Sequence, residues 1–120
     1  INQFLPGLIR GIHNEGLNVL WVCDPMHGNT FVSDSNFKTR RVDDISSEIR
    51  SFFEIHQAEG TIPGGVHFEL TGKDVTECIG GSQQIEDMHL DTNYATTCDP
   101  RLNAQQSLEL AFLIAEMLKQ

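Results

Sequence analysis

VLWVCDPMHGNT, residues 19–30, is the stretch that decides the class of fold. Its first five residues are apolar, which is typical of a parallel β-strand covered on both faces. The run ends in Asp24, Pro25, His27 and Gly28, with no signal for the start of a helix. In α/β proteins, functional side chains gather at the carboxyl ends of parallel strands. The stretch therefore predicts a buried strand that ends in a functional loop.

Amphipathic helices are predicted on both sides of this strand, because apolar residues recur there at helical spacing. Asn, Asp and Gly at their ends supply the caps that helices use. The predicted helices are residues 3–15, ending at Gly16; a helix capped by Asp43 or Asp44 and ending at Gly60; and a final helix capped by Asn103.

Three strands alternate with these helices in the predicted order. The first covers residues 17–23, the second is 66-VHFEL-70, and the third lies near 94-YATTCD-99. Residues 24–41 and 71–93 are expected to be loops, the latter with one or two short helical turns. Strands that alternate with helices pair in parallel through βα units. The chain therefore reads as a single α/β segment over residues 1–120.

Length and composition narrow the possible functions. The 120 residues are far fewer than the roughly 250 of a typical (β/α)8 barrel. A formal net charge of −9 argues against nucleic-acid binding, which needs a basic surface. No apolar run approaches the roughly 20 residues of a membrane span. Three cysteines without a CxxC spacing favour a reducing, intracellular compartment over a disulfide framework.

Each predicted strand carries a potential metal ligand at or near its end: His27, Glu69 and Asp99. Successive members of this set are separated by about one βα repeat. Neighbouring parallel strands would therefore direct one imidazole and two carboxylates into a shared volume. One neutral nitrogen with two anionic oxygens suits a divalent ion such as Mn²⁺, Co²⁺, Fe²⁺ or Zn²⁺.

Each ligand candidate also has a simpler interpretation. His27 alone fits a hydrogen-bonded loop histidine, Glu69 could face solvent, and Asp99-Pro100 is a common start of a turn. Their recurrence at every strand end favours the shared site. Three basic residues are candidates for binding an anionic substrate, although a solvated loop or an internal salt bridge also explains them. They are Lys38, Arg40 and Arg101.

Three long motifs resemble the closing third of the class II (plant and microbial) 3-deoxy-D-arabino-heptulosonate 7-phosphate (DAHP) synthases. They are WVCDPMHGNT, GGVHFELTGKDVTECIGG and CDPRLNAQQSLELAFLIAEML, in the same order. The resemblance covers essentially the whole chain. It implies a (β/α)8 TIM barrel, of which this chain supplies about three βα units, strands six to eight.

The resemblance also implies an activity: condensation of phosphoenolpyruvate with erythrose 4-phosphate and release of phosphate, the first step of the shikimate pathway. The family binds one divalent metal ion, here expected to be Mn²⁺ or Co²⁺, through a cysteine, a histidine, a glutamate and an aspartate. His27, Glu69 and Asp99 match the last three in the corresponding motifs. The cysteine ligand and the residues that hold phosphoenolpyruvate match nothing in this chain.

The missing ligands imply that the segment alone is inactive and needs the rest of the barrel or a companion chain. The complete protein is expected to form a homo-oligomer, in the cytoplasm of a microbe or the plastid of a plant. Two other interpretations stay open at this stage. One is a catalytically degenerate, stand-alone metal-binding module; the other is a hydrolase or lyase of a different metal-dependent barrel family.

Overall fold

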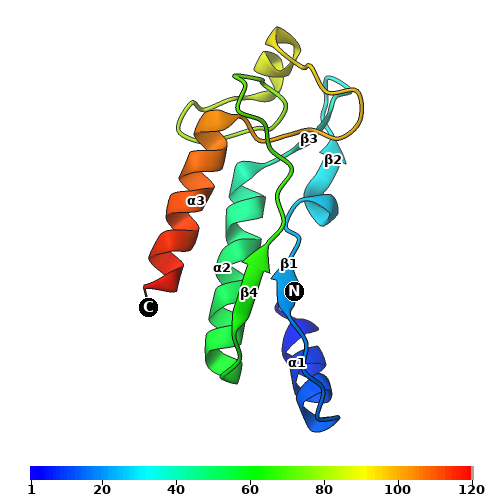
Figure 1. Ribbon diagram of the computed structural model, residues 1–120. Helices are drawn as coiled ribbons and strands as arrows, with labels where there is room; N and C mark the ends of the chain where they lie inside the picture. Colours follow the sequence, from blue (N-terminus) through cyan, green and yellow to red (C-terminus); the bar gives the residue numbers. More distant parts are fainter. Residues whose placement is uncertain (120) are drawn as a thin grey trace.

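Two short parallel strands lie at the centre of the computed structural model, which describes residues 1–119 (Figure 1). β1 (Trp21–Cys23) pairs with β4 (Pro63–Val66), and Cys23 lies opposite Val66. α2 (Val42–Glu59) connects the two strands and packs against β4. Both arrows in Figure 1 point toward the end of the molecule that carries the long loops. The predicted parallel pairing through a βα unit is therefore confirmed for these two strands.

The apolar stripe of α2 forms the middle of the core, as its spacing predicted. Its buried residues pack against β1 and α3 and include Ile45, Ile49, Phe52 and Phe53. The helix ends at Gly60, whose φ of +71° is the left-handed conformation that favours glycine. The predicted aspartate cap is wrong, because Arg41 occupies the N-cap and Asp43 and Asp44 lie in the first turn. Carboxylates in that turn still interact favourably with the helix dipole.

The two other α-helices pack against α2. α1 (Leu5–Asn14) is slightly shorter than predicted, and Arg10 in it makes an ion pair with Glu59 at 2.7 Å. α3 (Ala104–Leu118) begins at Asn103, the predicted cap, whose side chain accepts a hydrogen bond from the Gln106 N–H. Among residues 1–119, no helix combines the length and the apolar character that crossing a membrane requires.

The predicted loop over residues 24–41 contains a small antiparallel hairpin. After the single 3₁₀ turn η1 (His27–Asn29), β2 (Thr30–Val32) pairs with β3 (Lys38–Arg40). Asn36 has a φ of +69° in the turn between them, a conformation that asparagine tolerates better than most residues. The later loop contains one 3₁₀ helix, η2 (Asp87–Thr92). The expectation of a purely irregular first loop was therefore wrong.

The second and third predicted strands differ from the observed ones. β4 occupies residues 63–66 instead of 66–70, since Gly65 and Val66 make the ladder with β1. Residues 94–99 form no strand, and just after them an isolated parallel bridge links Leu70 to Leu102. The physical reason is that the carboxylate of Glu77 binds the backbone N–H groups of residues 95 and 96, which a strand would need for pairing.

The face of the β1–β4 pair that lies away from α2 is apolar and exposed. Side chains on or beside this face include Leu20, Val22 and Ile62, which are 77%, 53% and 81% exposed. Cys23 and Trp21, by contrast, pack into the core on the α2 side. The mixed α/β class is confirmed, with one face of its central strands uncovered within residues 1–119.

Candidate metal centre

The chain beyond β4 brings Glu69 next to the loop that follows β1. Residue 67 extends the parallel pairing by one bond, because its backbone N–H donates to the Cys23 carbonyl at 2.8 Å. Side chains alternate along an extended chain. Val66 and Phe68 pack against the core, so His67 and Glu69 lie on the opposite side. This alternation settles the orientation of Glu69 that the sequence left open.

The three ligand candidates from the sequence come together at this end of the strands. Nε2 of His27 lies 3.0 Å from Oε1 of Glu69 and 3.9 Å from Oδ2 of Asp99. One donor atom from each residue lies within 4.8 Å of the others. The His27 side chain is 54% exposed and the two carboxylates are 24% exposed, so the cluster opens to the surface. Asp99 reaches it from an irregular loop, not from the strand that was expected.

Each carboxylate of the cluster has a cation on its other oxygen. Lys38 Nζ lies 2.5 Å from Oδ1 of Asp99, and Arg40 Nη1 lies 2.5 Å from Oε2 of Glu69. The hydrogen bond from Lys38 lowers the pKa of Asp99, and the same contact raises the pKa of Lys38. Asp99 is therefore ionised at neutral pH. The other oxygen of each carboxylate, Oε1 of Glu69 and Oδ2 of Asp99, faces Nε2 of His27.

Arg40, one of the basic residues expected to bind substrate, is completely buried. Its Nε donates to the hydroxyl of Thr30 at 2.8 Å, and its Nη1 donates to the carbonyl of Pro100 at 2.7 Å as well as to Glu69. Its Nη2 has no hydrogen-bond partner among residues 1–119. The guanidinium thus joins the hairpin, the Glu69 segment and the loop that carries Asp99.

Arg101, the second of these residues, pairs with Glu77, which is completely buried. Burial opposes ionisation of Glu77, but hydrogen bonds led by those from Arg101 lower its pKa overall. The carboxylate also accepts hydrogen bonds, 2.9–3.1 Å long, from the backbone N–H groups of Ala95, Thr96 and Arg101. Glu77 therefore holds both sides of the loop around Asp99. No sequence pattern pointed to Glu77, because the partners of its carboxylate lie 18–24 residues further along the chain.

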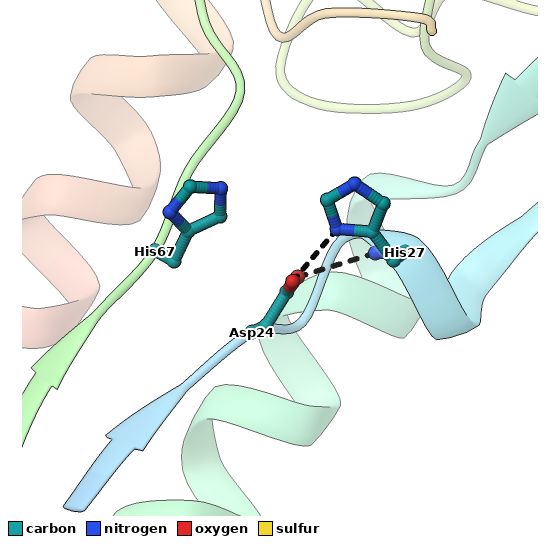
Figure 2. Close-up of side chains that lie close together, drawn as sticks. All are labelled: Asp24, His27 and His67. Carbon is teal, nitrogen blue, oxygen red and sulfur yellow. Dashed lines mark hydrogen bonds and ion pairs between the residues drawn. The ribbon is translucent and has the colours of Figure 1, made fainter.

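A second cluster shares His27 with the first one. Figure 2 shows Asp24, His27 and His67, with the Asp24 carboxylate bonded to the ring and the backbone N–H of His27. Nδ1 of His27 lies 2.7 Å from Oδ2 of Asp24, and the His67 ring centroid lies 6.1 Å from that of His27. Donor atoms of all three lie within 4.8 Å of one another. The sequence offered a local signal for Asp24, a carboxylate three residues before His27.

The donor set of the first cluster suits a divalent ion. An imidazole nitrogen with two carboxylate oxygens is the mixture that Mn²⁺, Co²⁺ and related ions accept. Both carboxylates already have ordered partners, which orient the ligand atoms as the outer hydrogen bonds of metal sites do. The residues present therefore fit one bound metal ion at His27, Glu69 and Asp99.

The fold and this cluster define a mixed α/β protein with a histidine–dicarboxylate group beyond the carboxyl ends of β1 and β4. The sequence model of the Class-II DAHP synthetase family matches residues 1–115. The chain belongs to this family, as the resemblance of its motifs indicated.

Curated relatives carry names in agreement with the family. The chain is 56% identical over 119 residues to the phospho-2-dehydro-3-deoxyheptonate aldolase AroG of Mycolicibacterium smegmatis. It is 53% identical over 121 residues to the phospho-2-dehydro-3-deoxyheptonate aldolase of Streptomyces coelicolor. Each alignment covers 99% of this chain and 26% of the relative. The chain therefore spans about a quarter of the length of these relatives.

Proposed function

We propose that this chain is the C-terminal part of the catalytic domain of a metal-dependent DAHP synthase. The complete protein would condense phosphoenolpyruvate with erythrose 4-phosphate and release inorganic phosphate. Membership of the family and the names of its relatives support this activity. The observation that carries the proposal is the cluster of His27, Glu69 and Asp99, since these side chains come from three separate segments yet converge on one volume.

In this proposal, one divalent ion, Mn²⁺ or Co²⁺, is held by Nε2 of His27, Oε1 of Glu69 and Oδ2 of Asp99. Bound there, the ion would supply Lewis acidity toward the aldehyde oxygen of the sugar phosphate. A cysteine from another part of the complete protein is the proposed fourth ligand. The two carboxylates, each paired with a cation, would hold the ion without adding a large net negative charge to the site.

The proposed reaction forms one carbon–carbon bond. The enol carbon of phosphoenolpyruvate bonds to the aldehyde carbon of erythrose 4-phosphate, whose oxygen takes up a proton. Water adds to C2 of the former phosphoenolpyruvate and phosphate leaves. Lys38 is the proposed contact for a substrate phosphate, because its side chain stays half exposed while it pairs with Asp99. Arg40 would act indirectly, since its paired guanidinium is completely buried. Arg101 would also act indirectly, since it donates to Glu77 from both Nε and Nη2 and is less exposed than Lys38.

We further propose that the rest of a (β/α)8 barrel covers the exposed face of the central strands. A parallel sheet normally has both faces covered, and two strands alone are a marginal structure. Leu20, Val22 and Ile62 instead leave a large apolar surface open within residues 1–119. The remaining strands would come from the rest of the same polypeptide or from a companion chain, and activity is expected only when they are present.

The test uses the complete protein that carries this segment. Wild-type protein should bind Mn²⁺ in a titration followed by electron paramagnetic resonance and should consume phosphoenolpyruvate when erythrose 4-phosphate is added. His27→Ala and Glu69→Ala should lose metal and activity together, whereas Asp34→Ala, at an exposed position in the hairpin turn, should lose neither. Retention of both properties by the His27 and Glu69 variants would contradict the assignment. Metal binding without consumption of phosphoenolpyruvate by the wild type would favour the degenerate metal-binding module.

A further inference from the structure

We propose that Asp24 is a positioning residue that fixes the tautomer of His27 and so directs the Nε2 lone pair toward the metal site. This inference rests on the proposed function, because it concerns the same cluster. It assigns a role to a residue that is not itself a ligand of that site. The test below therefore separates the role of Asp24 from the existence of the metal site.

Two backbone N–H groups hold the Asp24 carboxylate in place beside the imidazole of His27. Its Oδ1 accepts the backbone N–H groups of Met26 at 2.9 Å and His27 at 3.2 Å. These two donors fix the rotation of the carboxylate and direct Oδ2 to Nδ1 of His27, 2.7 Å away (Figure 2). The imidazole therefore meets an acceptor whose position is set by the backbone of the same turn.

The hydrogen bond between Asp24 and His27 decides which ring nitrogen of His27 carries the proton. An ionised carboxylate only accepts hydrogen bonds, so Nδ1 carries the proton whenever this bond is made. A neutral imidazole has one N–H and one lone pair, so Nε2 becomes the nitrogen that can bind a metal. Nε2 lies 3.0 Å from Oε1 of Glu69, so in the absence of metal a protonated Nε2 would donate to that carboxylate. A bound metal ion would take the place of the Nε2 proton, while the Nδ1 proton stays with Asp24 at the shorter distance of 2.7 Å. Asp24 and the metal site thus hold opposite sides of one ring.

The same bond argues against an independent metal ion between Asp24, His27 and His67. An ion bound there through Nδ1 of His27 would need a lone pair on the nitrogen that donates to Asp24, and one bound through Nε2 would use the atom that faces Glu69. His67 has no hydrogen bond to either side chain in Figure 2 and lies beside the His27 ring at a centroid distance of 6.1 Å and an interplanar angle of 27°. The His67 ring restricts where the His27 ring can move, and Asp24 sets the tautomer of His27.

Asparagine at position 24 separates the tautomer from the shape of the turn. In Asp24→Asn, the N–H groups of Met26 and His27 would keep the amide oxygen facing them. The amide NH₂ would then face Nδ1 of His27, which must become the acceptor and leave the proton on Nε2. Asp24→Ala removes both contacts and leaves the ring free to adopt either tautomer.

The experiment measures Mn²⁺ affinity and the ring tautomer in the complete protein. We expect Asp24→Asn to weaken Mn²⁺ binding by a factor on the order of 10–100, as losses of outer-shell partners do, and by at least as much as Asp24→Ala. With ¹⁵N-labelled histidine in metal-free protein, the neutral His27 ring should be protonated on Nδ1 in the wild type and on Nε2 in Asp24→Asn. The His27 signals are assigned by their absence in His27→Gln.

Asp87→Asn is the matched control. Asp87 also accepts hydrogen bonds from a backbone N–H and a hydroxyl, both of Ser35, but within residues 1–119 it makes no hydrogen bond or ion pair with a histidine. It should keep wild-type metal affinity and the wild-type His27 tautomer. Wild-type affinity in Asp24→Asn, or an unchanged tautomer, would overturn the proposal. So would a greater loss in Asp24→Ala than in Asp24→Asn, because that order would mean that Asp24 only supports the turn. A wild-type protein that binds no Mn²⁺ would overturn the proposed metal site, while the tautomer comparison would still decide the role of Asp24.

Discussion

Replacement of Glu77 by alanine should loosen the loop that carries Asp99. The carboxylate is completely buried and accepts five hydrogen bonds, three from backbone N–H groups and two from the guanidinium of Arg101. We expect the free energy of opening of residues 95–101 to fall by about 3–5 kcal/mol, the usual result of removing one partner of a buried ion pair. Metal binding should weaken with it, because Asp99 lies within this loop.

The magnitude follows from the groups that lose their partner. The N–H groups of Ala95, Thr96 and Arg101 would each lose an acceptor in a partly buried position. An unsatisfied buried donor costs about 1–3 kcal/mol. Water that enters the space left by the side chain would satisfy part of this demand, and the Arg101 side chain can turn to solvent because it is 31% exposed. Three such donors would together cost about 3–9 kcal/mol, and these compensations favour the lower part of that range, about 3–5 kcal/mol.

Amide hydrogen exchange of the complete protein, followed by mass spectrometry of peptides that cover residues 93–103, measures the effect. A loss of about 3 kcal/mol corresponds to exchange that is roughly 100-fold faster. Glu116→Ala is the control, because among residues 1–119 Glu116 pairs only with Lys119 and both side chains are more than 70% exposed. An exchange rate in Glu77→Ala within a factor of about three of the wild type would refute the reasoning.

The pKa of Glu77 adds a pH dependence with a definite sign. Because its pKa is lower in the folded protein than in the unfolded chain, ionised Glu77 stabilises the fold. This contribution is complete above the ordinary glutamate range and is lost as the pH falls through the lowered pKa. Protection of residues 95–101 in the wild type should therefore decline in acid, and Glu77→Ala should lack this part of the decline.

Two further predictions concern a glycine and the cysteines. Gly64→Ala should destabilise the protein by about 1–3 kcal/mol in thermal or urea unfolding, because a Cβ there would lie 2.7 Å from the Trp21 carbonyl oxygen. Gly65→Ala is the control, because a Cβ there meets nothing within 4 Å, and it should destabilise the protein less. Equal destabilisation by the two substitutions would contradict this prediction. Burial raises the pKa of Cys23 and Cys78 to about 12. Iodoacetamide at neutral pH should therefore leave both thiols unmodified until the protein unfolds, as measured by peptide mass spectrometry. Fast modification of either thiol in the folded protein would contradict their burial.

The helices could be predicted because their signals are local and repeated. The apolar spacing of α2, the left-handed glycine at position 60 and the cap at Asn103 each depend on a few neighbouring residues. The strands were harder, since β1 and β4 are only three and four residues long and their limits depend on which residues pair. The third predicted strand failed because Glu77, far away in sequence, binds its backbone N–H groups.

The ligand candidates could be predicted for a different reason: strand ends in α/β folds converge at one edge. That rule predicts that His27, Glu69 and Asp99 lie together, and one donor atom of each does lie within 4.8 Å of the others, although Asp99 lies in a loop. The rule does not say what surrounds the ligands. Arg40 belongs to a basic run that suggested an exposed loop, and only the packing of the hairpin shows that it is completely buried.

The burial of Arg40 also limits how this position can change over evolutionary time. Its guanidinium reaches three segments at once, through Thr30, Glu69 and the carbonyl of Pro100. Lysine keeps the charge but ends in a single nitrogen, which cannot reproduce the planar fork of arginine. Any shorter side chain would leave Glu69 without its cation and an empty space where the guanidinium lies. Position 40 should therefore accept almost no substitution, and a change there would have to be accompanied by changes at Thr30 and Glu69 and in the path of the loop that carries the Pro100 carbonyl.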